Sequence, residues 1–265
     1  MPEYISLHFT CKRNPIQILK WFKKHVGKKK RNILGSVIFE PIENKVLRKD
    51  VFDICTELSG FSPFFRGITI SVSDEKLITA QISSAISESN FILKKLIKKG
   101  FPIDEIAARI QFSFPVGNNY FFEIAKIRAM RILWAKVIEQ YKPKHECSLI
   151  TFIHSEISPT PTLPNGEGES IAQISKIKVL PFGKDLGWAI SNTSRLMSAS
   201  IGGSNSISIN SEDKFSERIN RSIRLIAKEE AYLNLINDAA GGSYYIENLT
   251  KKIAEESWKI FSNEK

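Results

Sequence analysis

The sequence predicts an α/β fold in which six β-strands alternate with helices. Short runs rich in β-branched and aromatic residues recur along the chain, and most are followed by a stretch with apolar residues three and four positions apart. Gly, Pro and Asn residues separate these segments. Each crossover would return the chain to the same edge of the sheet, so we expect the strands to be parallel. An open doubly wound sheet and a β/α barrel both fit this alternation.

The N-terminal part of the chain predicts two β/α units. Residues 4–10 alternate between apolar and polar types and predict a short strand. Asn14 and Pro15 are residue types favoured at the cap and the first turn of a helix, and apolar residues follow them at helical spacing. A strand over 33–40 and a short amphipathic helix over 50–58 form the second unit.

The middle of the chain contains the clearest unit. A β-rich run over 109–116 is joined by the turn 117–119 to an amphipathic helix over 121–134. Before it, a strand over 65–72 leads to a long helix over 75–99 that ends at a glycine. These two units continue the β/α rhythm.

The C-terminal part begins with a fifth strand over 147–154. A segment rich in Pro and Gly follows, and we expect a mobile loop over about 158–184 rather than a domain linker, because the β/α rhythm resumes after it. The remaining expected elements are a helix over 186–200, a strand over 206–210 and helices over 215–234 and 246–261.

The formal net charge of +10 is distributed unevenly. Residues 12–31 hold nine Lys or Arg and no acidic residue, so this cluster could face nucleic acid, a phosphorylated ligand or an acidic protein. Arginine, glycine and aromatic residues are not interleaved there as they are in nucleic-acid binders, so we favour a solvated helix face and expect no nucleic-acid partner.

The cysteines and the hydropathy pattern indicate the compartment. Cys11, Cys55 and Cys147 are widely spaced and form no CxxC pair, so buried thiols in a reducing compartment are expected rather than a disulfide framework or a zinc site. No apolar run reaches membrane-spanning length, and the N-terminus has no signal-peptide core. The sequence therefore predicts a cytoplasmic protein that has no membrane partner.

Three long motifs resemble the methylmalonyl-CoA mutase family. They are RIQFSFPVGNNYFFEIAKIRAMRILWAKVIEQY at 109–141, SASIGGSNSISIN at 198–210 and ERINRSIRLIAKEEAYLNLINDAAGGSYYIENLT at 217–250. They occur in the family's order, and the resemblance covers roughly residues 33–258.

The resemblance implies a TIM-barrel-like (β/α)8 fold for a single domain over residues 1–265. The order of the motifs matches 4–10 to about the third strand of the family barrel, so the first two strands would be missing. Such an incomplete barrel of six units exposes two sheet edges, which must close differently or be covered by a partner.

The resemblance also implies a chemistry that this chain does not carry alone. Family members interconvert methylmalonyl-CoA and succinyl-CoA with adenosylcobalamin, whose cobalt is ligated by the His of a D-x-H-x-x-G loop. His8, His25, His145 and His154 all lack that context, so no cobalamin-binding domain is expected. A catalytic His of the family falls near Ile70, and an aliphatic side chain cannot transfer a proton. We therefore predict no catalytic residue.

Three residues are candidates for contacts with an acyl-CoA substrate. Arg109 matches an Arg that contacts the CoA phosphates in catalytic relatives, although an ion pair with Asp104 or Glu105 is an equal alternative. Gln111 stands where the relatives have a contacting Ser. His154 begins an H-S-E sequence where the relatives have H-S-Q, and a structural role is the alternative.

Other polar residues of the motifs are expected to be structural. Glu123, Arg128 and Arg131 are predicted to form ion pairs on a helix surface or between subunits, and Lys126 to lie on the same solvent side. The turn that contains Gly241, Gly242, Tyr244 and Tyr245 is predicted to pack onto the barrel.

Together these features predict a small, non-catalytic subunit of an adenosylcobalamin-dependent methylmalonyl-CoA mutase. Its partner would be a catalytic large chain, with which it forms a heterodimer. A stand-alone acyl-CoA-binding protein and a degenerate mutase-like protein without isomerase activity are the alternatives.

Overall fold

The computed structural model describes residues 7–11, 14–26, 35–43, 46–59, 61–62, 65–74, 77–158, 187–211 and 213–263. The predicted loop over 158–184 lies outside these residues except for Ser158, and both ends of the basic cluster 12–31 lie outside them as well.

The strands run parallel and in the order of the sequence. One sheet has the order β1-β2-β5 and the other the order β6-β7-β8-β9. The strands are β1 (Leu7–Thr10), β2 (Gly35–Ile38), β5 (Phe65–Arg66), β6 (Ile68–Ser71), β7 (Ile110–Pro115), β8 (Ile153–Ile157) and β9 (Ser206–Ile209), with a separate antiparallel pair β3 (Ile42–Glu43) and β4 (Val46–Leu47). A doubly wound sheet would reverse its strand order. The predicted α/β class with an incomplete, barrel-like arrangement is confirmed.

Gly67 alone separates β5 from β6, which together form the single strand predicted at 65–72. A Cβ atom at Gly67 would lie 2.2 Å from Leu58 Cδ1 and 2.6 Å from Ile54 Cγ2, so helix α2 packs directly on the backbone here. The two sheets are joined beside this point by Thr69, whose hydroxyl donates to the carbonyl oxygen of Val37 over 3.0 Å.

The sheet curls so that distant strands face each other. The ring centroids of His8 on β1 and His154 on β8 lie 5.0 Å apart. In a flat sheet these strands, four positions apart, would be separated by about 19 Å. Among the described residues β1 pairs only with β2 and β9 only with β8, so the curled sheet keeps two open edges.

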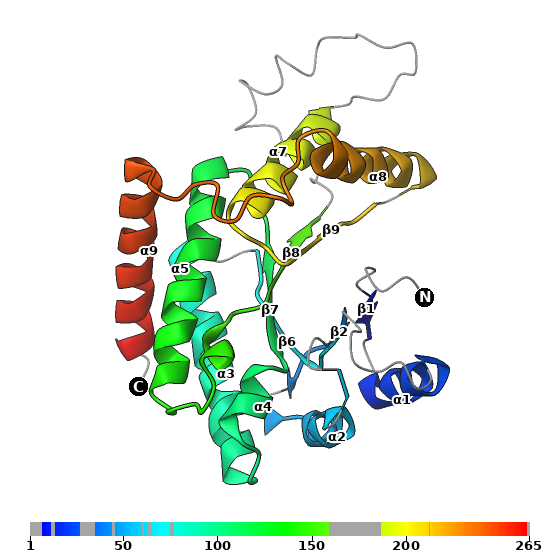
Figure 1. The fold of residues 1–265 in the computed structure, drawn as a ribbon, viewed down its shortest axis with the longest axis vertical. Helices are drawn as coiled ribbons and strands as arrows, with labels where there is room; N and C mark the ends of the chain where they lie inside the picture. The colour runs from blue at the N-terminus through cyan, green and yellow to red at the C-terminus, as the bar shows by residue number, and fades with distance from the viewer. Residues whose placement is uncertain are drawn as a thin grey trace.

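The helices surround the sheet as a β/α fold requires (Figure 1). They are α1 (Pro15–Val26), α2 (Lys49–Leu58), α3 (Ile78–Lys98), α4 (Ile103–Ala107), α5 (Tyr120–Glu139), α7 (Gly187–Ile201), α8 (Lys214–Glu229) and α9 (Tyr244–Asn263), with a 3-10 helix η1 over Glu146–Leu149. The strand predicted at 147–154 starts later than expected because η1 occupies its first residues. No helix of the described part is long and apolar enough to cross a bilayer.

Helix α5 occupies the centre of the fold. Its Trp134 meets Phe112 of β7 edge to face at 4.9 Å, and α9 packs along α5 and α3 outside the layer next to the sheet (Figure 1). Lys126 is only 1% exposed because its side chain runs toward β7 and α3, where its Nζ donates to the carbonyl oxygen of Pro115 and to Gln81 Oε1. The prediction that Lys126 lies at the surface is therefore wrong.

The prediction of buried thiols holds for one cysteine only. Cys55 is buried, and burial raises the pKa of its thiol to about 12. Cys11 is partly buried and Cys147 is exposed.

We expect Gly67→Ala to lower the free energy of unfolding by about 1–3 kcal/mol, because the added methyl group overpacks the contact with α2. Urea denaturation measures this cost. In a Leu58→Ala background the same substitution should cost less, because the obstructing side chain has been removed. Equal costs in both backgrounds would show that Leu58 is not the obstacle.

Candidate functional site

The concave face of the curled sheet is lined by polar side chains. On β7, Phe112 packs against helix α5, so the alternating residues Gln111 and Ser113 belong to the opposite face. Thr69 of β6 pairs with Gln111 in the strand register, and His154 of β8 pairs with Ser113. Both side chains therefore lie on the same face as their partners. We treat this polar interior as the candidate functional site.

Two histidines form the best-ordered part of the polar interior. His8 Nδ1 lies 2.6 Å from Ser36 Oγ. His154 Nδ1 lies 2.7 Å from Ser206 Oγ, and its Nε2 lies 3.1 Å from Ser208 Oγ. A neutral imidazole has one donor and one acceptor nitrogen, and serine hydroxyls can serve either of them.

Burial keeps both imidazoles neutral. It lowers the pKa of His154 to about 4, with a smaller contribution from neighbouring His8, whose own pKa is also lowered by burial. A group with so low a pKa is a weak base at neutral pH. The pair is therefore suited to hydrogen bonding rather than to proton transfer.

Gln111 carries an unused acceptor. Its Nε2 donates to Thr69 Oγ1 over 2.7 Å, while its Oε1 has no hydrogen-bond partner among the described residues. The side chain is 0% exposed. An orphan buried acceptor costs about 1–3 kcal/mol, so a ligand N–H that reached this atom would be stabilised.

Arg109 uses its guanidinium group for the scaffold. Nη1 donates to the carbonyl oxygens of Ser62 and Phe65 over 2.6 and 3.2 Å, and Nη2 donates to that of Leu58 over 2.7 Å. The expected alternative is an ion pair with Asp104 or Glu105. The Asp104 carboxylate instead accepts from the Ser148 hydroxyl over 2.6 Å. Burial lowers the pKa of Arg109, and Glu105 acts on it only as a nearby charge that favours the protonated form and so opposes this shift. Arg109 precedes β7, so it lies at the amino-terminal end of the sheet, opposite the end at which β/α barrels bind ligands.

The predicted substrate residues are therefore not brought together. Gln111 and His154 belong to the polar interior, whereas Arg109 lies at the sheet's amino-terminal end beside a cavity of about 10 Å³, the size of one water. Their contact with a substrate stays a prediction.

Two neighbouring positions have structural contacts. Ile70, where the resemblance places a catalytic histidine, is fully buried and stands beside Phe112 in the register, on the face that packs against the helices. Glu156 accepts a hydrogen bond from Asn210 Nδ2 over 2.6 Å, which ties the end of β8 to the residue after β9.

Several polar residues of the interior were not predicted from the sequence, although their alternating pattern is visible there. Ser36, Thr69, Ser206 and Ser208 stand at alternate positions of their strands, as His8 does. Small polar residues repeating on one face of several predicted strands indicate a polar interior, because the usual barrel interior consists of branched apolar residues.

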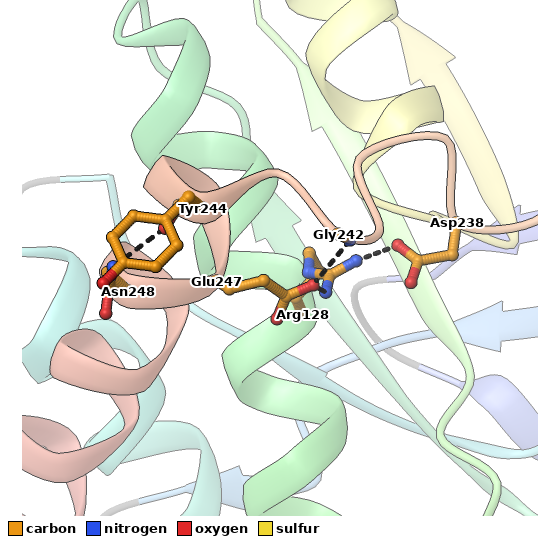
Figure 2. Close-up of polar contacts among 6 residues, drawn as sticks. All are labelled: Arg128, Asp238, Gly242, Tyr244, Glu247 and Asn248. Carbon is orange, nitrogen blue, oxygen red and sulfur yellow. Dashed lines mark hydrogen bonds and ion pairs between the residues drawn. The ribbon is translucent and has the colours of Figure 1, made fainter.

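The two longest motifs meet in a clasp that Figure 2 shows. Arg128 of α5 binds Asp238 and, through Nη2, Glu247 Oε1 over 2.6 Å. The backbone N–H of Gly242 donates to the same Glu247 oxygen over 3.2 Å. The clasp fastens the start of α9 to α5. The predicted surface ion pair of Arg128 thus exists and joins two elements.

The turn packs onto α5 as predicted, through Asp238 and the buried Ala240, but its two tyrosine side chains do not take part. Tyr244 is 86% exposed, and only its backbone carbonyl is engaged, by Asn248 (Figure 2). Tyr245 is also exposed and meets Phe121 edge to face at 5.5 Å.

Glu123 and Lys126 form an ion pair inside the protein rather than on the helix surface. Lys126 Nζ lies 2.6 Å from Glu123 Oε2 and donates to the carbonyl oxygen of Pro115 over 2.6 Å. Burial lowers the pKa of Lys126, and the neighbouring Glu123 carboxylate opposes that shift. The prediction that Glu123 pairs at the surface is wrong. Arg131 instead donates to backbone carbonyls, Thr151 among them over 2.8 Å.

Comparison with known proteins gives a consistent result. The family model described as methylmalonyl-CoA mutase matches residues 77–162 and 189–264. The methylmalonyl-CoA mutase small subunit of Porphyromonas gingivalis is 30% identical over 97% of this chain and 42% of its own length. The large subunit of that organism is 29% identical over 86% of this chain and 30% of its own length, and the methylmalonyl-CoA mutase of Rhizobium meliloti is 29% identical over 79% and 28%. The chain thus spans less than half of each of these relatives.

The free energy of unfolding should decrease as the pH is lowered from about 6.5 to about 4. In that pH range His154 is protonated in the unfolded chain but stays neutral in the folded protein. The stability that its burial as a neutral group contributes is therefore fully present above the unfolded pKa and is lost as the pH falls. The lowered pKa of His154 corresponds to a total change of about 3 kcal/mol in the free energy of unfolding. Urea denaturation at several pH values in this range should give a free energy of unfolding that depends less steeply on pH for His154→Gln than for the wild type. The control His25→Gln, at an exposed residue of α1, should keep the wild-type slope.

Proposed function

The chain belongs to the methylmalonyl-CoA mutase family, and from this premise we propose that it is a small, non-catalytic subunit of an adenosylcobalamin-dependent mutase. The partner would be a catalytic large chain that interconverts methylmalonyl-CoA and succinyl-CoA. The main support is Ile70, because the position of the family's catalytic histidine holds an aliphatic residue in the helix-facing core. The small subunit among the relatives supports the same proposal.

The histidines of this chain do not fit the role of cobalt ligand. His8 and His154 are held by serine hydroxyls in the polar interior, and His25 Nδ1 lies 2.8 Å from the carbonyl oxygen of Trp21. His145 precedes η1, and like the others it lacks the D-x-H-x-x-G loop. We therefore assign cobalamin binding to the large chain. Among the described residues no group of three or more His, Cys, Asp and Glu is arranged to hold a metal ion.

A second candidate function is binding of an acyl-CoA in the polar interior. The orphan Oε1 of Gln111 favours it, because the amide N–H groups of a CoA ester are donors of the kind that this atom needs. The neutral His154 could add a further hydrogen bond. Arg109 could reach a CoA phosphate only by giving up carbonyl contacts that it makes now.

Co-expression with the large mutase chain of the same organism tests the main proposal. The two chains should co-purify as a heterodimer, and the small chain alone with adenosylcobalamin should form no succinyl-CoA from methylmalonyl-CoA. The heterodimer should be active. Turnover by the isolated small chain would refute the non-catalytic assignment, and failure to associate would refute the subunit role.

Calorimetry with CoA esters tests the second candidate. If the interior binds an acyl-CoA, Gln111→Leu should weaken binding by roughly tenfold, as loss of one buried hydrogen bond predicts. Gln140→Leu is the matched control, because Gln140 is exposed just after α5. Absence of heat with the wild type, or equal affinities of wild type and Gln111→Leu, would dismiss this site.

A further inference from the structure

Helix α8 and the turn after it expose an unusual amount of apolar surface. Five large apolar side chains within twelve residues are each more than half exposed: Leu225, Ile226, Tyr232, Leu235 and Ile236. We call these five residues the α8 ridge. Exposed apolar residues that stand singly are normal, whereas a cluster of this kind marks a contact surface.

The position of α8 explains why the ridge is uncovered. Only Asn220 and Ile223 of this helix are buried, and its packing partner is α7. In a closed barrel each outer helix has a neighbour on both sides. Helix α8 follows β9, the edge strand, so its second neighbour is absent from the described residues.

Three arginines beside the ridge have no ion-pair partner among the described residues, whereas Lys228 pairs with Glu229. Arg218, Arg221 and Arg224 are exposed and form no ion pair with any described residue. Helix α8 carries five Lys or Arg against two Glu. Arginine, tyrosine and leucine exposed together suit the centre of a protein interface, and the excess of cations calls for an acidic counterpart.

A depression of about 520 Å³ lies beside α8. It is lined by residues from the end of β9 and the first turns of the helix, among them Asn210, Lys214, Glu217 and Arg224. Its lining carries the cations Lys214 and Arg224 and the acids Asp213 and Glu217, so charges of both signs face the hollow. The surface is thus shaped as well as charged.

Hydrogen bonds order the backbone of the turn after α8. Tyr232 has a positive φ of 52°, a conformation that costs energy in a residue other than glycine. The N–H of Leu235 donates to the Tyr232 carbonyl oxygen over 3.1 Å, and that of Leu233 to Ala227 over 3.1 Å. A pre-ordered turn loses little conformational entropy on binding.

We propose that the α8 ridge is the surface through which this chain docks onto a mutase large chain, and that the partner meets it with an apolar patch edged by Asp and Glu. The proposal rests on the subunit role argued above, and on the existence in one organism of a small and a large chain that are both similar to this one. A protein suits the surface better than an anionic membrane does, because the exposed acids Glu229 and Glu230 stand between the ridge residues Ile226 and Tyr232.

The test uses the full chain with the large chain of the same organism. Two double variants, Arg221→Glu/Arg224→Glu beside the ridge and Leu225→Ser/Leu235→Ser within it, are together called the ridge variants. Each should bind the large chain at least tenfold more weakly, with an unchanged thermal midpoint. The matched control Lys94→Glu/Lys98→Glu makes the same charge change on exposed positions of α3 and should bind within about twofold of wild type. Wild-type binding should weaken as salt rises.

Each other outcome has a definite meaning. Wild-type affinity in both ridge variants would overturn the ridge while leaving the subunit role intact. No binding by the wild type would overturn both. Self-association of the wild type that the ridge variants abolish would assign the ridge to a second copy. If the wild type co-sedimented with phosphatidylserine vesicles but did not bind the large chain, and the ridge variants did not co-sediment, the ridge would be a membrane-binding surface. Self-association and membrane binding would each overturn the proposal.

Discussion

The ammonium group of Lys126 is buried, so its charge must be stabilised by protein groups instead of water. Its charge is neutralised by Glu123 one turn earlier and is further held by the Pro115 carbonyl at the end of β7 and by Gln81 Oε1 of α3 at 3.2 Å. An unpaired charge at this depth would cost several kcal/mol. The ion pair therefore fixes α5 against β7 and α3, and the remaining helices are arranged around that assembly.

The sheet has two different faces. Its outer face packs phenylalanine and isoleucine side chains against the helices, with Phe112 on Trp134 as the closest ring contact of that layer with α5. Its inner face is a chain of hydroxyl, amide and imidazole groups from His8 to Ser208. Polar groups inside a barrel contribute little hydrophobic stabilisation, and one of them, Gln111, remains unsatisfied. The helices and α9 thus supply most of the apolar packing of this fold.

Local patterns predict most of the parallel strands, although η1 replaces the first half of the strand predicted at 147–154. Other errors come from contacts between segments far apart in the sequence. The close packing of α2 on Gly67 depends on the position of Leu58, and the burial of Lys126 depends on contacts with Pro115 and Gln81. Arg109 could not be assigned from the sequence because its acceptors are backbone carbonyls, which every residue has. Gln111 and His154 were found from a resemblance, whereas the polar alternation that unites them with His8 is visible in the residues themselves.

The clasp between Arg128 and the turn before α9 has a consequence for synthesis of the chain. Its partners, Asp238 and Glu247, stand 110 and 119 residues downstream of the arginine. While the ribosome is still adding those residues, α5 has already been synthesised and the side of it that α9 contacts is uncovered. Nascent chains of this kind expose apolar surface until their last segment is released. The native packing of α5 is therefore completed only after α9 has been translated.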